Sequence, residues 1–370
     1  MNRRDFIKCG TILAGVGGAC YLCGCGKKIF IKDTSEMINP LNDIRPCKIP
    51  FTHIEIQGDG DAYSCCPDFL KERKSLGNIT NKSLEEIWNG KNIEDLRQRL
   101  LNGDYSLCRR DICGMYSPCS KEEIPSYYKS GAEEILISYD YECNYNCITC
   151  RDEIKINNTE EMDLYENVFL PKILKFAENV NYVNLLGSGE PFYSRHTRHL
   201  IQELINKYPD IRFKIMTNGV FMDEKNINEL GIAYNIDGIS VSLDCVKSET
   251  YEKIFRADNF NTVLKNIKHM AKWKKEGKIG WMVINFVIHS LNYKEMVDFA
   301  KLAQKLDVIA FFSVYRPWLS SKMCERYDEV AVFEPENEHY EEFVKILQNP
   351  VFKDKKHCHI ENRLYNLVFS

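Results

Sequence analysis

The chain has 370 residues, a formal net charge of −4 at pH 7, 28% charged residues and 44% hydrophobic residues. This length fits two or three domains with buried cores, and the composition is that of a soluble globular protein. No block of Lys and Arg is long enough to follow a phosphate backbone, so nucleic acid is not expected as a main partner. The 16 cysteines are unusual for a chain of this length. They favour metal binding, because a long chain with regular helix and strand patterns is unlike a small disulfide scaffold.

Residues 1–28 have the features of a targeting segment. The pair Arg3-Arg4 precedes Phe6, and an uncharged, glycine-rich stretch extends from Cys9 to Gly26. This pattern resembles a twin-arginine export signal, and Cys25 lies where a lipoprotein signal would be processed. The glycines make the stretch a poor transmembrane helix. We expect export or membrane association through this segment; the alternative is a cytoplasmic protein with an uncleaved N-terminus that lies against the membrane.

The next part of the chain has short elements and many turns. Residues 29–46 are expected to form a linker, and residues 47–120 a small domain with six cysteines. Within this domain, the spacing of apolar residues predicts helices at 84–88 and 93–101. Residues 121–133 are predicted to be a second, polar linker.

From residue 134 onward, apolar runs alternate with amphipathic stretches. The amphipathic stretches have the helical period, as at Leu200, Ile201 and Leu204. The apolar runs have the length of buried strands and lie at 135–141, 182–186, 213–217, 239–243, 282–288 and 308–314. Six strands that alternate with helices predict an α/β fold with a parallel sheet or an open barrel over residues 134–320, followed by a C-terminal extension at 321–370.

Three cysteines follow the first of these strands. Cys143, Cys147 and Cys150 have the spacing C-x3-C-x2-C, which gathers three thiols in one loop. Such a loop can bind three irons of a 4Fe–4S cubane and leave the fourth iron open to a substrate. The loop also follows the carboxyl end of a strand, where β/α folds have their active sites. The alternative is a zinc site, but zinc usually takes four ligands and no histidine lies nearby in the sequence.

This motif and the segments after it resemble the radical S-adenosylmethionine (SAM) superfamily over about residues 134–320. The segment Gly187-Ser188-Gly189-Glu190-Pro191 follows the second strand and resembles the family's Gly-Gly-Glu-Pro segment, whose backbone contacts the methionine part of SAM. Thr217-Asn218-Gly219 after the third strand is also similar to the family. Relatives often have an aromatic residue just before the third cysteine, and Thr149 in that place implies different contacts to adenine. The resemblance implies a partial (β/α)6 barrel of the radical SAM type.

The fourth and fifth strands add further candidate ligands of SAM. Ser240, Ser242 and Asp244 alternate along the fourth strand and therefore point to one side, where the ribose and methionine are expected. Arg256 matches an arginine that in relatives pairs with the methionine carboxylate; the alternative is an ordinary surface arginine. Asn285, on the fifth strand, could approach the ligand as well.

The upstream cysteines resemble the SPASM pattern of auxiliary iron–sulfur domains. Cys47, Gly60, Cys65 and a later cysteine pair occur in the family's order. The resemblance implies a small SPASM-like domain at 47–120 that holds an auxiliary cluster, with one cluster favoured over two. It departs from the family because the domain precedes the barrel and has fewer cysteines. A structural zinc is the alternative. The implied ligands are Cys47, Cys65, Cys108 and Cys113, with Cys66 and Cys119 in reserve.

The resemblance also implies an activity. A 4Fe–4S cluster would cleave SAM reductively, and the 5′-deoxyadenosyl radical would take a hydrogen atom from a substrate, as in oxidoreductases of this kind. A peptide substrate is favoured, with a sugar or small alcohol as the alternative, and the sequence assigns no catalytic residue. The reductant would be a protein such as flavodoxin or ferredoxin. Two further hypotheses are a non-catalytic iron–sulfur electron carrier and a zinc-stabilised binding module at a membrane.

Overall fold

The computed structural model describes residues 44–110, 113–185, 188–317 and 321–369. The predicted targeting segment at 1–28 and nearly all of the predicted linker at 29–46 lie outside these residues. No helix within the described ranges is both long and apolar enough to cross a membrane.

A curved sheet of ten strands runs through the described chain, in the order β10-β9-β8-β7-β6-β5-β4-β1-β2-β3. Its centre consists of six parallel strands that follow one another in chain order, as right-handed strand–helix–strand units do. These strands are β4 (Glu134–Ser138), β5 (Tyr182–Leu185), β6 (Arg212–Thr217), β7 (Ile236–Ser242), β8 (Trp281–Ile288) and β9 (Ile309–Val314). They confirm the six predicted strands, and their boundaries differ by a few residues.

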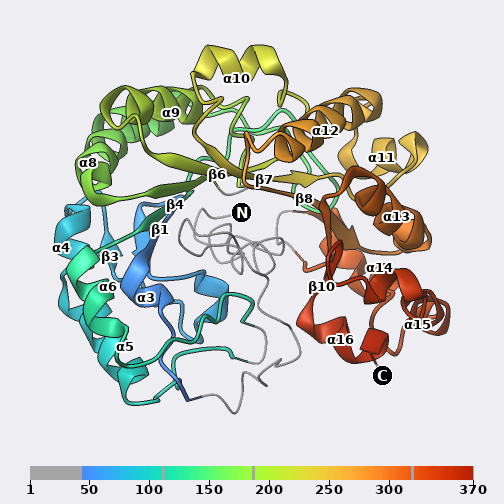
Figure 1. Cartoon of the computed structure of the whole chain (residues 1–370), viewed down its shortest axis with the longest axis horizontal. Helices are drawn as coiled ribbons and strands as arrows, with labels where there is room; N and C mark the ends of the chain where they lie inside the picture. Colours follow the sequence, from blue (N-terminus) through green and yellow to red (C-terminus); the bar gives the residue numbers. More distant parts are fainter. Residues whose placement is uncertain (1–43, 111–112, 186–187, 318–320, 370) are drawn as a thin grey trace.

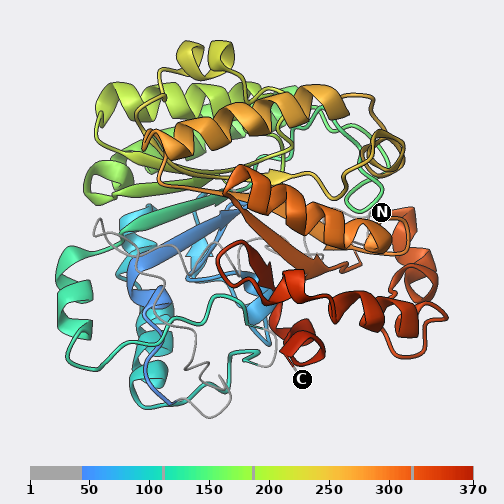
Figure 2. The same cartoon turned by 45° about the vertical axis from the view of Figure 1, so that its right-hand side comes forward.

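Helices cover the outer, convex side of the central strands (Figure 1). They are α7 (Thr159–Leu164), α8 (Leu170–Phe176), α9 (Arg195–Lys207), α10 (Glu224–Leu230), α11 (Ser248–Phe255), α12 (Phe260–Lys275) and α13 (Met296–Leu306). Figure 2 shows α12 and α13, in orange, running across the outside of the sheet. The architecture is therefore a partial barrel, as predicted.

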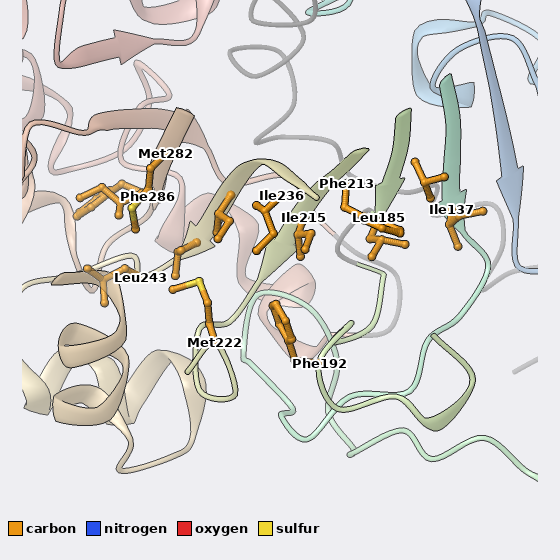
Figure 3. Packing of buried hydrophobic residues seen from close by; sticks show 14 of the residues in the cluster. Ile137, Leu185, Phe192, Phe213, Ile215, Met222, Ile236, Leu243, Met282 and Phe286 are labelled. Atoms are coloured by element: carbon orange, nitrogen blue, oxygen red, sulfur yellow. The ribbon is translucent and has the colours of Figure 1, made fainter. Parts of the chain in front are cut away.

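The two faces of the barrel wall differ in polarity. The outward residues of the strands are apolar and pack under the helices, as at Ile137, Leu185 and Ile215 (Figure 3). The inward residues are largely polar and form a wall that we call the inner wall: His53, Glu55, Gln57, Glu134, Ser138, Asn184, Lys214, Ser240, Ser242 and Asn285. Because side chains alternate between faces along a strand, the register of the sheet fixes this division.

The N-terminal domain joins this sheet directly. Its strand β1 (His53–Gln57) pairs in parallel with β4 along five register positions, from His53 with Glu134 to Gln57 with Ser138. Strand β2 (Asp61–Tyr63) pairs antiparallel with β1, and β3 (Gly77–Asn78) pairs antiparallel with β2, so the sheet continues beyond β1. The helices of this domain are α3 (Ile49–Thr52), α4 (Leu84–Trp88) and α5 (Lys91–Leu101). Helices α4 and α5 confirm the two predicted helices, whereas β1 was not predicted.

Two expected segments are more ordered than the sequence indicated. The stretch 121–133, expected as a linker, contains helix α6 (Ile124–Ser130), which begins with a proline in its first turn. The C-terminal extension adds β10 (Cys358–Ile360), which pairs in parallel with β9 and lengthens the sheet at its other edge. Its helices are α14 (Tyr327–Val330), α15 (Tyr340–Leu347) and α16 (Asn362–Phe369).

Candidate active site

Strand β4 leads into the loop that carries the three predicted cluster ligands, which we call the cysteine loop (residues 143–155). The Cys143 N–H donates to the Lys155 carbonyl at 2.9 Å and closes the base of this loop. The N–H groups of Cys150 and Arg151 both donate to the Cys147 carbonyl, at 2.9 and 3.0 Å, and turn the chain between the last two cysteines. The structure thus brings the three thiols together at the carboxyl end of β4.

The three thiols form a donor set that suits a cubane. Burial raises the pKa of Cys143 to about 12 and raises that of Cys147 as well, and the neighbouring thiols add to the rise at Cys147. Thiolates there need compensating positive charge, which bound irons supply. No group of three Cys, His, Asp or Glu side chains in the described ranges suits a single metal ion. A cubane needs less convergence, because each thiolate binds a different iron.

Contacts from distant parts of the chain fix the cysteine loop. The Ile148 N–H donates to the carbonyl of Ile254 in α11 at 2.9 Å. The Tyr145 hydroxyl lies between the Tyr251 hydroxyl at 3.2 Å and the Asn259 amide at 3.0 Å. These contacts hold the loop from its outer side, so that thiol positions are set before any cluster binds.

Arg151 links the cysteine loop to the turn after β5. This buried guanidinium donates through Nε to the Cys150 sulfur at 3.4 Å, through Nη1 to the Tyr141 carbonyl at 2.7 Å, and through Nη2 to the Ser188 carbonyl. A rigid fork of donors suits this role, because it fixes three acceptors in one plane. Arg151 thus holds the third cysteine against one of the predicted SAM-binding residues.

The turn after β5 approaches the cysteine loop very closely. The Glu190 N–H donates to the Glu142 carbonyl at 2.8 Å. A Cβ on Gly189 would lie 2.5 Å from the Glu142 carbonyl oxygen and 2.7 Å from that of Asp140, which leaves room for glycine alone. Ser188 is buried beside it, and Gly187 lies outside the described residues. The predicted SAM-binding turn therefore lies directly against the start of the cysteine loop.

Glu190 and Thr217 form hydrogen bonds that connect the loops after β5 and β6. The Glu190 carboxylate accepts from the Thr217 hydroxyl at 2.7 Å, from the Asn218 N–H at 2.7 Å and from the Phe192 N–H at 3.2 Å. Burial raises the pKa of Glu190 to about 7, although these hydrogen bonds oppose the rise. The Asn218 amide in turn donates to the Asn144 side chain at 2.9 Å. The loops after β4, β5 and β6 are thus joined by one hydrogen-bond network.

Strands β7 and β8 contribute the next part of the inner wall. The Asn285 amide donates to the Ser240 hydroxyl at 2.7 Å, while the buried Asn285 Oδ1 has no partner in the described part of the chain. Ser242 lies half-buried on the same face. The Asp244 carboxylate accepts from the Val287 N–H at 2.7 Å, and burial raises the pKa of Asp244 to about 7. The structure therefore places Ser240 and Ser242 on the same face as Asn285, as expected from their alternation, whereas Asp244 lies two residues beyond the end of β7 with φ 57°.

Arg256 lies on the outer side of the cysteine loop. Its Nη1 atom contacts the carbonyl oxygens of Asn146 and Asp152, both at 3.3 Å, and Nη2 lies 3.8 Å from the Asp152 carboxylate. Arg256 also ends α11 in the left-handed conformation, with φ 54°. In this structure it stabilises the loop backbone, and its predicted pairing with a methionine carboxylate stays a prediction.

The upstream thiols form a second group. Burial raises the pKa of Cys65 well above its ordinary value, and the thiols of Cys113, Cys108 and Cys47 add to the rise, so the four predicted auxiliary ligands lie within electrostatic reach of one another. Cys66 is buried beside Cys65 and Cys113. Four clustered thiols suit an iron–sulfur cluster, and they would also suit zinc.

The auxiliary thiols lie against the barrel. Cys65, Cys66 and Cys113 pack in one apolar cluster with Leu136 of β4 and Met216 of β6, both inward residues of the wall. Cys119 lies apart from this cluster: it packs with Phe51 and Ile124, and its thiol donates to the Pro46 carbonyl at 3.4 Å. The second thiol group therefore opens towards the barrel interior.

Sequence reasoning missed several residues that shape the site. Asp140 is buried and accepts from the Thr197 hydroxyl at 2.6 Å and from the Asn157 amide at 2.8 Å, which anchors the chain just before the cysteine loop. The Ser321 hydroxyl donates to the Ile148 carbonyl from the far end of the chain. Arg151, directly after the third cysteine, was the one signal that the sequence offered, as a cation beside a thiol.

Two family models match the chain. Residues 138–303 match the radical SAM superfamily, and residues 47–114 match SPASM, an iron–sulfur cluster-binding domain. A probable GTP 3′,8-cyclase of Saccharolobus islandicus is 31% identical over 184 residues, which are 48% of this chain and 54% of that protein. The GTP 3′,8-cyclase of Nautilia profundicola is 25% identical over 182 residues, with the same two shares. The chain spans about half the length of the curated relatives it matches.

Two solved structures align with parts of this chain. SuiB of Streptococcus suis bound to S-adenosylmethionine aligns with a TM-score of 0.42 and 16% identity, over 74% of this chain and 62% of that one. Methylornithine synthase (PylB) aligns with a TM-score of 0.36 and 12% identity, over 64% of this chain and 62% of that one.

The family matches agree with the geometry of the two thiol groups. The radical SAM domain implies a 4Fe–4S cluster and SAM, and the SPASM domain implies auxiliary iron–sulfur clusters. The three thiols of the cysteine loop lie within the first match, and the four upstream thiols lie within the second. Residues 138–303 therefore form a radical SAM domain, and a SPASM domain at residues 47–114 precedes it in the chain.

Proposed function

We propose that this protein cleaves SAM reductively and uses the resulting radical to modify a substrate, with a peptide favoured and a sugar or small alcohol as the alternative. The observation that carries the proposal is the cysteine loop, whose three half-buried cysteines follow directly after the Asp140–Glu142 backbone that meets the Gly189–Glu190 turn. When bound, a 4Fe–4S cluster supplies the electron that breaks a carbon–sulfur bond of SAM.

The chain's own residues would orient SAM and keep water out. Cys143, Cys147 and Cys150 would hold three irons, and the backbone around Gly189 would meet the methionine end. Ser240 and Ser242 line the inner wall beside it, Asp244 lies just beyond the end of β7, and together they offer hydroxyl and carboxyl groups to a ribose. The Glu190 network joins three loops and would fix their relative positions during turnover.

The test is a search for 5′-deoxyadenosine. The protein is reconstituted anaerobically with iron and sulfide, reduced with dithionite and mixed with SAM, and the products are measured by mass spectrometry. We expect 5′-deoxyadenosine even without substrate. A bound cluster that leaves SAM intact would instead favour the electron carrier. The match to GTP 3′,8-cyclases covers about half of those proteins, so GTP is included as one test compound among peptides and sugars.

Loss of auxiliary ligands is expected to separate the two metal sites. In a Cys65→Ala, Cys113→Ala variant, iron should fall from about eight to about four atoms per chain, because one cubane loses two ligands. Formation of 5′-deoxyadenosine should persist, because the cysteine loop is intact. The Cys358→Ala variant is the control and should keep its iron, since Cys358 is a buried cysteine of β10 and is not a predicted ligand of either cluster. A zinc content of about one with four irons would show that the SPASM domain holds zinc instead.

The N-terminal segment is proposed to direct export or membrane association. The support is the Arg3-Arg4 pair before a glycine-rich uncharged stretch. In cells that have the twin-arginine pathway, we expect the wild type in the membrane or exported fraction, and an Arg3→Lys, Arg4→Lys variant in the cytoplasm. Cell fractionation with immunoblotting measures this. Equal cytoplasmic amounts of both proteins would contradict the proposal.

A further inference from the structure

One carboxyl group on the inner wall lacks the partners that its neighbours have. Glu55, at the middle of β1, is fully buried. Its Oε1 accepts from the Gln57 amide, but its Oε2 has no hydrogen-bond partner within the described ranges. The hydroxyl of Ser138, on the adjacent strand β4, lies beside this carboxyl and is likewise buried without a hydrogen bond of good geometry among the described residues. Two buried oxygen atoms on neighbouring strands, Glu55 Oε2 and Ser138 Oγ, thus lie close together without a well-formed hydrogen bond in the described ranges.

Another carboxyl group of the inner wall, that of Glu134, has several polar partners. Glu134 lies two residues before Leu136, which is the register partner of Glu55. Its carboxylate accepts hydrogen bonds from Lys214 Nζ at 2.5 Å and from the Asn184 amide at 3.0 Å, and the His53 ring nitrogen lies 3.4 Å away. No ion pair to Glu55 is found in the described part of the chain. Because burying a carboxyl oxygen without a partner costs free energy, such a group is rarely kept without a use.

The position of Glu55 connects the two thiol groups. On one side it is near enough to the auxiliary thiols to act on them: burial is the main cause of the raised pKa of Cys66, and the Glu55 carboxyl is the next. On the other side it lies near Tyr141, whose carbonyl binds Arg151 of the cysteine loop. The Tyr141 ring also fills the space beside Gly58 at the end of β1, where a Cβ would come within 2.3 Å of the ring.

The charges around this position are unbalanced. Asp59 lies in the turn after β1 and Asp61 begins β2, and an auxiliary cluster held by thiolates adds further negative charge. Burial raises the pKa of Glu55 to about 7, and the nearby polar groups of Ser138 and Gln57 oppose the rise only in part. A ligand that brings a positive charge and several N–H donors would satisfy both free oxygen atoms and offset the negative charge.

We propose that Glu55 and Ser138 form the recognition site for a primary ammonium group of the substrate, between the cysteine loop and the auxiliary thiols. The inference rests on the proposed function, since it places the substrate in that barrel. An ammonium has three donors, so it can serve Glu55 Oε2 and Ser138 Oγ and keep one donor for water or a third group. Glu55 acts here as a positioning and specificity residue; it orients the substrate by its charged end.

Binding of a small amine tests this site without any turnover. The anaerobically reconstituted protein, without SAM, is titrated with n-butylammonium chloride and separately with 1-butanol, and ligand binding is followed by broadening of the ligand's proton NMR lines. We expect saturable broadening by n-butylammonium and clearly weaker binding of 1-butanol. Glu55→Gln keeps the shape but removes the charge and should weaken amine binding roughly 10- to 100-fold. Ser138→Ala should weaken it by a smaller factor.

Controls separate recognition from damage to the fold. Glu166→Gln changes a carboxyl on the outer side of the sheet, where it contacts His196 and His199, and should bind the amine like the wild type. If Glu55→Gln fails to load iron, the inference is tested by the amine affinity of Ser138→Ala and by the comparison of n-butylammonium with 1-butanol. Equal amine affinity in Glu55→Gln and wild type, preference for 1-butanol, or no saturable binding would overturn the inference. Saturable amine binding by a protein that forms no 5′-deoxyadenosine from SAM would contradict the proposed function but would still support this amine site.

Discussion

Replacing Cys143, Cys147 and Cys150 together with alanine is expected to abolish 5′-deoxyadenosine formation and to remove about four of about eight irons per chain. The reason is that the cysteine loop supplies these three thiols from a framework that other contacts already fix, and alanine offers iron no ligand. The Ile148–Ile254 hydrogen bond and the contacts of the Tyr145 hydroxyl involve no cysteine side chain, so the variant should fold. Iron analysis and mass spectrometry of the reaction products measure the two effects.

The matched control is Cys245→Ala. Cys245 is buried, and its thiol donates to the Leu243 carbonyl at 3.3 Å. It is not a predicted ligand of either cluster. Its loss should leave the iron content and the 5′-deoxyadenosine yield as in the wild type. Residual SAM cleavage in the triple variant, with half of the iron retained, would mean that the auxiliary site performs the chemistry and that the assignment of the two groups is reversed.

A single methyl group at Gly189 should have the second largest effect. In Gly189→Ala the new Cβ would lie 2.5 and 2.7 Å from two backbone carbonyl oxygens, which cannot move aside like the end of a flexible side chain. The turn must shift away from the cysteine loop and lose the 2.8 Å hydrogen bond from Glu190 to Glu142. Because a displacement of about 1 Å can cost roughly 100-fold in rate, we expect SAM cleavage to fall by about that factor.

The iron content tells this effect apart from misfolding. Gly189→Ala should keep its irons, because all seven predicted thiol ligands are unchanged. Its affinity for SAM and its rate of SAM cleavage should be lower than in the wild type. The control is Gly231→Ala, at the end of α10, where φ is 72° and a Cβ meets nothing within 4 Å. It should cost about 1 kcal/mol of stability through backbone strain but leave SAM cleavage unchanged. Equal activity of both variants would show that the turn does not contact SAM.

The central strands were predictable because their outward residues form apolar runs of the right length. Strand β1 was missed for a reason that the structure makes plain: its sequence alternates Ile54 and Ile56 with His53, Glu55 and Gln57, and the polar members face the inner wall. A short segment with as many polar as apolar residues looks like a turn-rich region when its partner strand is unknown. Strand β10 is only three residues long and becomes a strand through its pairing with β9.

The cysteine ligands were predictable because their spacing within one loop carries the chemistry. The supports of that loop were not, since they come from far along the chain: Ile254 is 106 positions from Ile148, and Ser321 is 173 positions from it. Thr217 was predicted to contact SAM; the structure shows its hydroxyl bound to Glu190, and the contact to SAM stays a prediction. A motif thus indicates which residues gather at a site, but long-range hydrogen bonds decide which of them are left to meet a ligand.

The pairing of β1 with β4 has a consequence for electron transfer. The strand that precedes the auxiliary thiols and the strand that ends at the cysteine loop share a ladder of main-chain hydrogen bonds over five register positions. The relative position of the two thiol groups is therefore fixed through a shared sheet and does not depend on how two separate domains dock. Electron tunnelling falls off steeply with distance, so a fixed spacing would give a constant rate of transfer in every turnover, with no hinge motion to gate it.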